Sequence, residues 1–175
     1  MVERVIGVKK IIFQDIDGVL YPCFHRGRLK MNQDRVKAKL IATDSYYEDA
    51  NAKDLLASYE GFDKDAMKRL KKLVDETGAY IVVSSSWRFM HTIKDFKQMF
   101  HIHGLKDAVI DIAPMASSFL KEPSIEEYLH AHPDIDAYVI LDDINMESHF
   151  PGHCVVCPDV FDEECLEKAL QILKK

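Results

Sequence analysis

The hydrophobic positions of this chain fall into short runs that alternate with longer amphipathic stretches. The short runs are rich in β-branched residues, which is typical of strands buried in a sheet. They predict strands near residues 11–13, 80–83, 109–113, 138–141 and 154–157. Polar or glycine residues follow these runs, as expected where a strand gives way to a turn.

Between these runs, apolar residues recur at the spacing of helices. Asp63, for example, is placed to cap a helix in which Met67, Leu70 and Leu73 share one face, and Gly78 is placed to end that helix. The predicted helices span residues 33–42, 47–59 and 63–77, run from Thr92 to just before Gly104, begin at Ser124, and span residues 162–173.

Two further helices begin with the pattern of a capping box. Asp95 follows Thr92 by three residues, which is close to a capping box. The sequence Ser124-Ile125-Glu126-Glu127 matches a capping box and predicts a helix that opens at Ser124.

Strands that alternate with helices predict an α/β fold, with a Rossmann-like, mainly parallel sheet and helices on both faces. The 175 residues suit a single domain over residues 1–175. Residues 22–62 interrupt the alternation, because 41 residues are too many for an ordinary connection after the first strand. We expect this segment to form a small helical insertion.

Composition narrows the class of protein. Hydrophobic residues make up 47% of the chain and charged residues 30%, which argues against disordered and membrane-embedded proteins. No apolar run reaches the length needed to span a membrane. Residues 1–10 lack the apolar core of a signal peptide, so we expect a cytoplasmic protein with no membrane partner.

The charge is unevenly distributed. The net charge of −6 argues against bulk electrostatic binding of nucleic acid. Residues 22–40 nevertheless carry a net charge of +5. The charged residues of this basic segment are Arg26, Arg28, Lys30, Arg35, Lys37 and Lys39, against Asp34.

Cys154 and Cys157 suggest a zinc site, since His149 and His153 come just before them. The sequence Cys-Val-Val-Cys also fits a short buried strand, and no second cysteine pair of this spacing is present. We therefore favour the strand.

Candidate chemistry gathers where the predicted strands end. Asp15, Asp17 and Gly18 directly follow the first strand, and parallel strands carry their chemistry at their carboxyl ends. Two carboxylates held so close repel each other, and a divalent cation or a shared proton relieves the repulsion. A carboxylate can also attack phosphorus. The alternative is an ordinary polar turn.

Two other strands end in polar side chains. The strand over residues 138–141 runs into Asp142 and Asp143, which repeats the first pattern. The strand over residues 80–83 runs into Ser84 and Ser85, followed by Trp87 and Arg88. The guanidinium group of Arg88 would suit a phosphate, while the alternative is a serine-rich turn before a helix.

These motifs together resemble those of the haloacid dehalogenase (HAD) superfamily, whose first motif is a hydrophobic strand followed by Asp-x-Asp-Gly. The resemblance implies that Asp15 is the nucleophile and Asp17 the general acid and base. It implies phosphate binding by Ser84, with Ser85 as second choice, and by Lys121, the lysine ahead of the last motif. It implies an Mg²⁺ cofactor held by Asp15, Asp17, Asp142 and Asp143, with Asp142 the stronger ligand.

The implied activity is that of a phosphatase, a hydrolase of phosphoric monoesters that works through an aspartyl-phosphate. The combination of motifs is most similar to the branch of HAD domains attached to "Swiss army knife" RNA-repair proteins. The substrate is then a phosphorylated small molecule or a nucleic-acid end. The alternatives are a low-turnover binding or regulatory module, and a small-metabolite phosphatase or phosphotransferase. A dehalogenase does not call for Asp17 or the metal.

In HAD proteins a cap or flap follows the first motif and covers the active site. Residues 22–62 are placed to form such a cap, and a surface helical hairpin is the alternative. If the basic segment folds over the site, it would favour a substrate with several negative charges.

Overall fold

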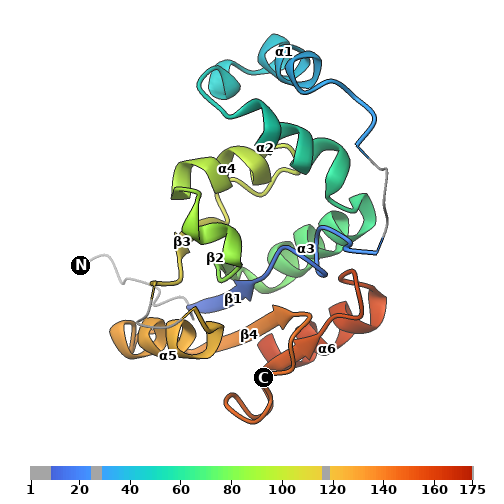
Figure 1. The fold of residues 1–175 in the computed structure, drawn as a ribbon. Coiled ribbons are helices and arrows are strands. Elements are labelled where there is room, and N and C mark those ends of the chain that lie inside the picture. The colour runs from blue at the N-terminus through green and yellow to red at the C-terminus, as the bar shows by residue number, and fades with distance from the viewer. Residues whose placement is uncertain (1–8, 25–28, 116–118, 175) are drawn as a thin grey trace, which may run out of the picture.

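The structure is a computed structural model that describes residues 9–24, 29–115 and 119–174. Its centre is a sheet of five parallel strands in the order β3-β2-β1-β4-β5 (Figure 1). The strands are β1 (Lys10–Gln14), β2 (Tyr80–Val83), β3 (Val109–Ile112), β4 (Ala137–Asp142) and β5 (Cys154–Val156). The predicted α/β class and parallel sheet are therefore confirmed.

Helices cover both faces of the sheet, which explains why the strands read as unbroken apolar runs. Ile12 of β1 belongs to a core shared with α3 (Lys64–Thr77), α4 (Ile93–His101) and α6 (Glu163–Leu173). Ile11 and Phe13 point to the other face, where α5 (Lys121–Ala131) packs. Alternate residues of one strand thus stabilise two separate cores, at roughly 1.5–3 kcal/mol for each large side chain buried.

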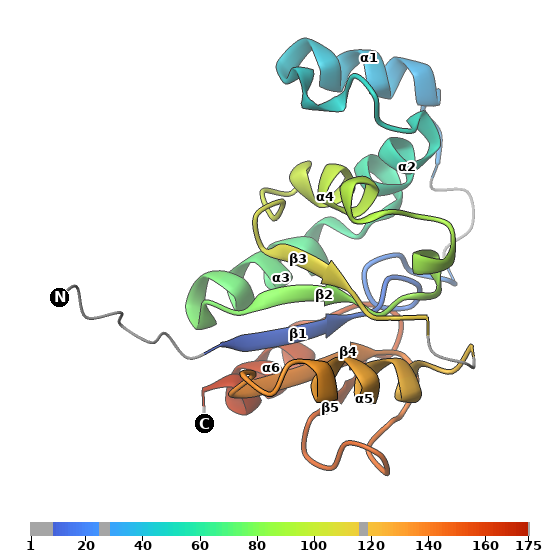
Figure 2. The ribbon, with the colours of Figure 1, turned by 90° about the vertical axis from the view of Figure 1, so that its left-hand side faces the viewer.

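The order of the strands reverses direction at the centre of the sheet. From β1 the chain adds β2 and β3 on one side, and then crosses to add β4 and β5 on the other. The arrowheads in Figure 2 all point to the same edge. In sheets of this kind ligands bind at the carboxyl ends of the strands where the order reverses. In this sheet the reversal lies between β1 and β4.

Several local signals are confirmed. Asp63 caps α3 by accepting hydrogen bonds from two backbone N–H groups, and Gly78 ends that helix with a φ of 68°. Thr92 and Asp95 form the capping box at the start of α4.

The prediction of one continuous helix over residues 47–59 is wrong. The structure has a 3-10 turn over Ser45–Tyr47, the short helix α2 (Ala52–Leu56) and a π-helical turn over Ala57–Gly61. Asn51 causes the break, because its side chain caps α2 from within the predicted helix.

The predicted capping box at Ser124 is also wrong. Helix α5 begins at Lys121, so Ser124 lies inside its first turns and is fully buried. Its hydroxyl donates to Leu120 O and accepts from Arg88, which leaves it no capping role. A contact between distant segments has overridden the local signal.

The insertion forms its own small layer outside the sheet. Helix α1 (Gln33–Thr43) packs on α2 around a cluster that includes Val36, Leu40, Tyr47 and Leu55. Figures 1 and 2 show α1 as the outermost helix, with α2 lying between it and α4. The insertion therefore rests on α4, and the cap over residues 22–62 stays a prediction. No helix within the described ranges is long and apolar enough to cross a membrane.

Candidate active site

Backbone hydrogen bonds bring the three acidic or hydroxyl motifs together at the carboxyl edge of the sheet. The backbone N–H of Asp15 donates to Leu141 O at 3.0 Å, which sets it beside the end of β4. The backbone N–H of Ser84 donates to Gln14 O at 3.0 Å, which sets it beside the end of β1. The backbone hydrogen bonds of the sheet therefore determine how close these motifs lie to one another.

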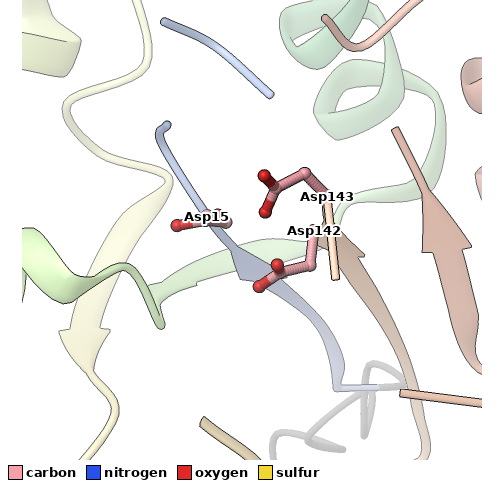
Figure 3. A group of neighbouring side chains, drawn as sticks. All are labelled: Asp15, Asp142 and Asp143. Carbon is pink, nitrogen blue, oxygen red and sulfur yellow. The ribbon is translucent and has the colours of Figure 1, made fainter. Parts of the chain in front are cut away.

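Three carboxylates meet at this edge. Asp15, Asp142 and Asp143 each offer an oxygen, and these atoms all lie within 4.8 Å of one another (Figure 3). Asp15 and Asp142 are only 2% and 1% exposed, whereas Asp143 is exposed. Burial of carboxylates this close carries a high electrostatic cost unless positive charge compensates it.

Lys121 supplies part of that compensation. Its Nζ lies 2.8 Å from Asp15 Oδ2 and 2.8 Å from Asp142 Oδ2, and its side chain is 12% exposed. Burial lowers the pKa of Lys121, but Asp142 and Asp15 outweigh it, so the pKa lies above its ordinary value. Burial and the neighbouring Asp15 raise the pKa of Asp142 to about 7. One ammonium group is therefore shared between two buried carboxylates.

The remaining charge suits a divalent cation. Three carboxylates and one ammonium leave two negative charges when all are ionised. Oxygen donors and few protein ligands are what Mg²⁺ prefers, since it keeps several of its waters. The donor set of Asp15, Asp142 and Asp143 therefore fits the Mg²⁺ that HAD proteins use.

The chain also approaches this cluster closely at Gly18. The φ of Gly18 is 75°, and a Cβ added there would lie 2.8 Å from Asp143 Oδ2. Glycine is needed here both for the backbone conformation and for the space beside Asp143.

Asp17 is not one of the three clustered carboxylates. Its Oδ2 accepts a hydrogen bond of 2.8 Å from the indole Nε1–H of Trp87. Burial raises the pKa of Asp17 above its ordinary value, although the Trp87 bond lowers it. Its carboxylate is not part of the acidic group of Figure 3, so Asp17 as a metal ligand stays a prediction.

The two serines after β2 have different roles. Ser84 Oγ is buried and has no hydrogen-bond partner among the described residues. Ser85 Oγ accepts from Trp87 N at 3.4 Å and so caps the 3-10 turn Ser86–Phe89. An unpaired buried hydroxyl is costly, so Ser84 is the better candidate to donate to a bound phosphate.

Arg88 lies behind these serines. It is 2% exposed, and its Nη1 donates to Ser84 O at 2.8 Å and Ser85 O at 3.0 Å. Its Nη2 donates to Ser124 Oγ at 3.1 Å. The guanidinium group thus holds the serine loop against α5, and its direct contact with phosphate stays a prediction.

Sequence reasoning missed Trp87 and Ser124 as parts of this site. Trp87 lies within the Ser-Ser-Ser-Trp-Arg motif, and this position could have indicated that it belongs to the site. Ser124 gave no such signal, because it meets Arg88 only through the packing of α5.

The two cysteines of the possible zinc site belong to different cores of the protein. Cys154 packs with the core on the α5 face, whereas Cys157 belongs to the core on the α3 and α6 face. The three aspartates are the only group of potential metal ligands found in the described part of the chain. The favoured strand reading of this segment is confirmed by β5.

Comparison with known proteins identifies the family. The family described as "HAD domain in Swiss Army Knife RNA repair proteins" matches residues 11–167. The chain belongs to this family. The match spans every strand except the first residue of β1, together with all four motifs of the HAD site. Neither the curated proteins nor the solved structures compared with the chain gave a match.

Membership of the HAD family supports a phosphohydrolase in general terms. The backbone pairing of Asp15 and Ser84 and the ion pairs of Lys121 with Asp15 and Asp142 bring these four residues together at the carboxyl edge of the sheet.

Proposed function

We propose that this HAD domain is an Mg²⁺-dependent phosphomonoesterase that works through an aspartyl-phosphate on Asp15. The observation that carries the proposal is the position of Lys121, 2.8 Å from both Asp15 and Asp142. An ammonium group there stabilises Asp15 as a carboxylate, which is the form that can attack phosphorus.

Asp15 is the nucleophile in this proposal. Lys121 is bound to Asp15 Oδ2, which leaves Oδ1 free to attack. The new bond forms between Oδ1 and phosphorus as the bond between phosphorus and the leaving oxygen breaks. Water then attacks phosphorus, which releases inorganic phosphate and restores the carboxylate of Asp15.

Asp17 transfers the protons for both steps. In the first step it donates a proton to the leaving oxygen, and in the second it takes a proton from the attacking water. The raised pKa of Asp17, due first to burial, supports the acid role, because a general acid must hold its proton near neutral pH.

Positive charge and hydrogen-bond donors stabilise the transferring phosphoryl group. Lys121 and the unpaired hydroxyl group of Ser84 are the side chains that would donate to the phosphoryl oxygens. Asp15, Asp142 and Asp143 would hold Mg²⁺, which supplies positive charge to the phosphoryl oxygens when bound. Stabilising this charge is the main requirement of phosphoryl transfer.

We further propose that the substrate is a phosphorylated end of a polynucleotide or a multiply charged nucleotide. Two observations support it: the printed description of the family refers to RNA repair, and the basic segment over residues 22–40 carries +5. Additional phosphates of such a substrate would contact these positive side chains.

The test is turnover of para-nitrophenyl phosphate and of 3′- and 5′-phosphorylated oligonucleotides, with Mg²⁺ and with EDTA. We expect turnover with Mg²⁺, none in EDTA, and none in the Asp15→Asn variant at any Mg²⁺ concentration. Asp107→Asn, the same exchange at an exposed position, is the matched control and should retain full activity. Full activity of the parent in EDTA would contradict the metal-dependent mechanism.

A further inference from the structure

We propose that Trp87 is a positioning residue for the general acid Asp17, and that the insertion braces it through His91 and Asp54. The inference rests on the proposed function, since it assigns a role in the same reaction. It also gives the helical insertion a function other than covering the site.

The contact between Trp87 and Asp17 is direct. The indole Nε1–H donates to Asp17 Oδ2 at 2.8 Å, and no other side chain in the described ranges donates to this carboxyl group. A carboxyl group that is bound through one oxygen loses its freedom to rotate. Oδ1 is then the oxygen that exchanges a proton with the leaving group, in an orientation that Trp87 determines.

The indole ring is itself held by its neighbours. The ring of His91 stacks on it, with ring centres 5.6 Å apart and planes at 25°. The rings of Phe62 and Tyr21 pack around it at 6.1 Å each. The donor therefore projects from a packed cluster of aromatic rings.

His91 connects this cluster to the insertion. Its Nδ1 lies 2.9 Å from Trp87 O, and its Nε2 lies 3.0 Å from Asp54 Oδ1. Both partners are acceptors only, so an imidazolium with two N–H groups satisfies both bonds. Burial lowers the pKa of His91, but its bonds to Trp87 and Asp54 outweigh that effect and raise it.

Asp54 is the end of the chain of contacts and belongs to α2 of the insertion. The side chains of His91 and Asp54 are 13% and 20% exposed, so water only partly weakens their pairing. The contacts run from α2 through His91 and Trp87 to the second aspartate of the first motif. The insertion thus stabilises the orientation of Asp17 indirectly, through His91 and Trp87.

The first test compares Trp87→Phe with the parent on two substrates. Phenylalanine keeps an aromatic face but lacks the N–H group. Para-nitrophenyl phosphate has a good leaving group and needs little acid catalysis, whereas an alkyl phosphate needs it fully. We expect kcat/KM to fall about 10²-fold for the alkyl phosphate and much less for para-nitrophenyl phosphate, with unchanged inhibition by inorganic phosphate.

The second test observes the contact without turnover. Trp87 is the only tryptophan in the sequence, so its indole N–H gives a single NMR resonance. Asp17→Ala removes the acceptor and should move this resonance. Asp54→Asn should move it in the same direction by less, because it loosens the brace and leaves the acceptor in place.

The insertion provides a matched control for the brace. Asp44 pairs with His101 of α4 at 2.8 Å, which is the same kind of contact without a link to Trp87. Asp54→Asn should slow the alkyl phosphate selectively, whereas Asp44→Asn should leave both the kinetics and the indole resonance unchanged.

The outcomes separate this inference from the function it rests on. Equal losses on both substrates in Trp87→Phe, or an indole resonance unaffected by Asp17→Ala, would overturn the positioning role. Identical behaviour of Asp54→Asn and Asp44→Asn would overturn the brace. A parent chain that hydrolyses neither substrate would defeat the proposed phosphatase, while the indole resonance would still test the contact.

Discussion

Lys121 determines the charge balance of the site, since it is the ammonium group bonded to two buried carboxylates. We expect Lys121→Met to lower the free energy of unfolding in EDTA by about 3–5 kcal/mol, because it leaves buried negative charge without a partner. Urea denaturation measures the change. Lys168→Met, which breaks an exposed pair with Glu164, is the control and should have little effect. Equal stability of the two variants would argue against the shared ammonium.

Gly18 and Gly152 allow the space beside Asp143 to be tested separately from backbone strain. Their φ angles are 75° and 77°, but only at Gly18 would a Cβ meet another atom, Asp143 Oδ2 at 2.8 Å. Alanine at either position should cost roughly 1–2 kcal/mol of stability. Only Gly18→Ala should also weaken Mg²⁺ binding, as measured by calorimetric titration, because Asp143 must move. Equal Mg²⁺ affinity in both variants would count against Asp143 as a ligand.

Individual side chains differed in how far the sequence could predict them. Asp15, Asp142 and Ser84 were predictable, because each lies at or directly after the end of a strand and parallel strands end at one edge. Arg88 was predicted as a phosphate contact. Its bonds to the serine carbonyls and Ser124 could not be predicted, because they depend on how distant segments pack.

Among the elements, the contact between the π-helical turn and the end of α4 should make stability depend on pH. Burial lowers the pKa of His103 to about 4, and its Nε2 lies 3.2 Å from Ser58 O. In the unfolded chain His103 takes up a proton near pH 6.5, whereas in the folded chain it does so only near pH 4, the pKa to which burial lowers it. Stability is therefore fully present above pH 6.5 and declines as pH falls, by about 1.4 kcal/mol per pH unit.

His103→Gln should flatten this decline between pH 6.5 and about 4, as measured by urea denaturation at several pH values. His149→Gln, which removes an exposed imidazole, is the matched control and should keep the slope of the parent. A parent whose stability does not fall over this range would contradict a neutral His103 in the folded chain.

The elements also show where local sequence signals suffice. Asp63, Thr92 and Gly78 set helix ends through their own backbone contacts, so the sequence predicted them. The capping signal at Ser124 looked equally strong in the sequence, but the Ser124 hydroxyl bonds to Arg88 and the helix begins at Lys121. Local signals therefore fail where a partner from another part of the chain uses the same group.

The charge distribution over the protein bears on substrate choice. Two acidic residues next to the basic segment have other partners: Asp44 pairs with His101, and Asp49 with Lys94. Neither of these two carboxylates pairs with Lys30, Arg35, Lys37 or Lys39, the described positive side chains of the segment. Arg26 and Arg28 of this segment lie outside the described residues.

We expect the double variant Arg26→Ala and Arg28→Ala to raise the KM for a phosphorylated oligonucleotide and to flatten its salt dependence. The KM for para-nitrophenyl phosphate should stay the same, because that substrate has no further phosphates. The double variant Lys168→Ala and Lys174→Ala removes the same charge from the region of α6 and should behave like the parent. Unchanged kinetics of the arginine variant on both substrates would point to small metabolites.

The central claim is that phosphate is carried on Asp15, and trapping the intermediate tests it most directly. In Asp17→Asn, a substrate with a good leaving group should still phosphorylate Asp15, while water is no longer activated to release the phosphate. Acid quenching followed by peptide mass spectrometry should then find phosphate on Asp15, labile to hydroxylamine as an acyl phosphate. The double variant Asp15→Asn and Asp17→Asn should carry none. Phosphate on any other residue, or turnover by Asp15→Asn, would contradict the mechanism.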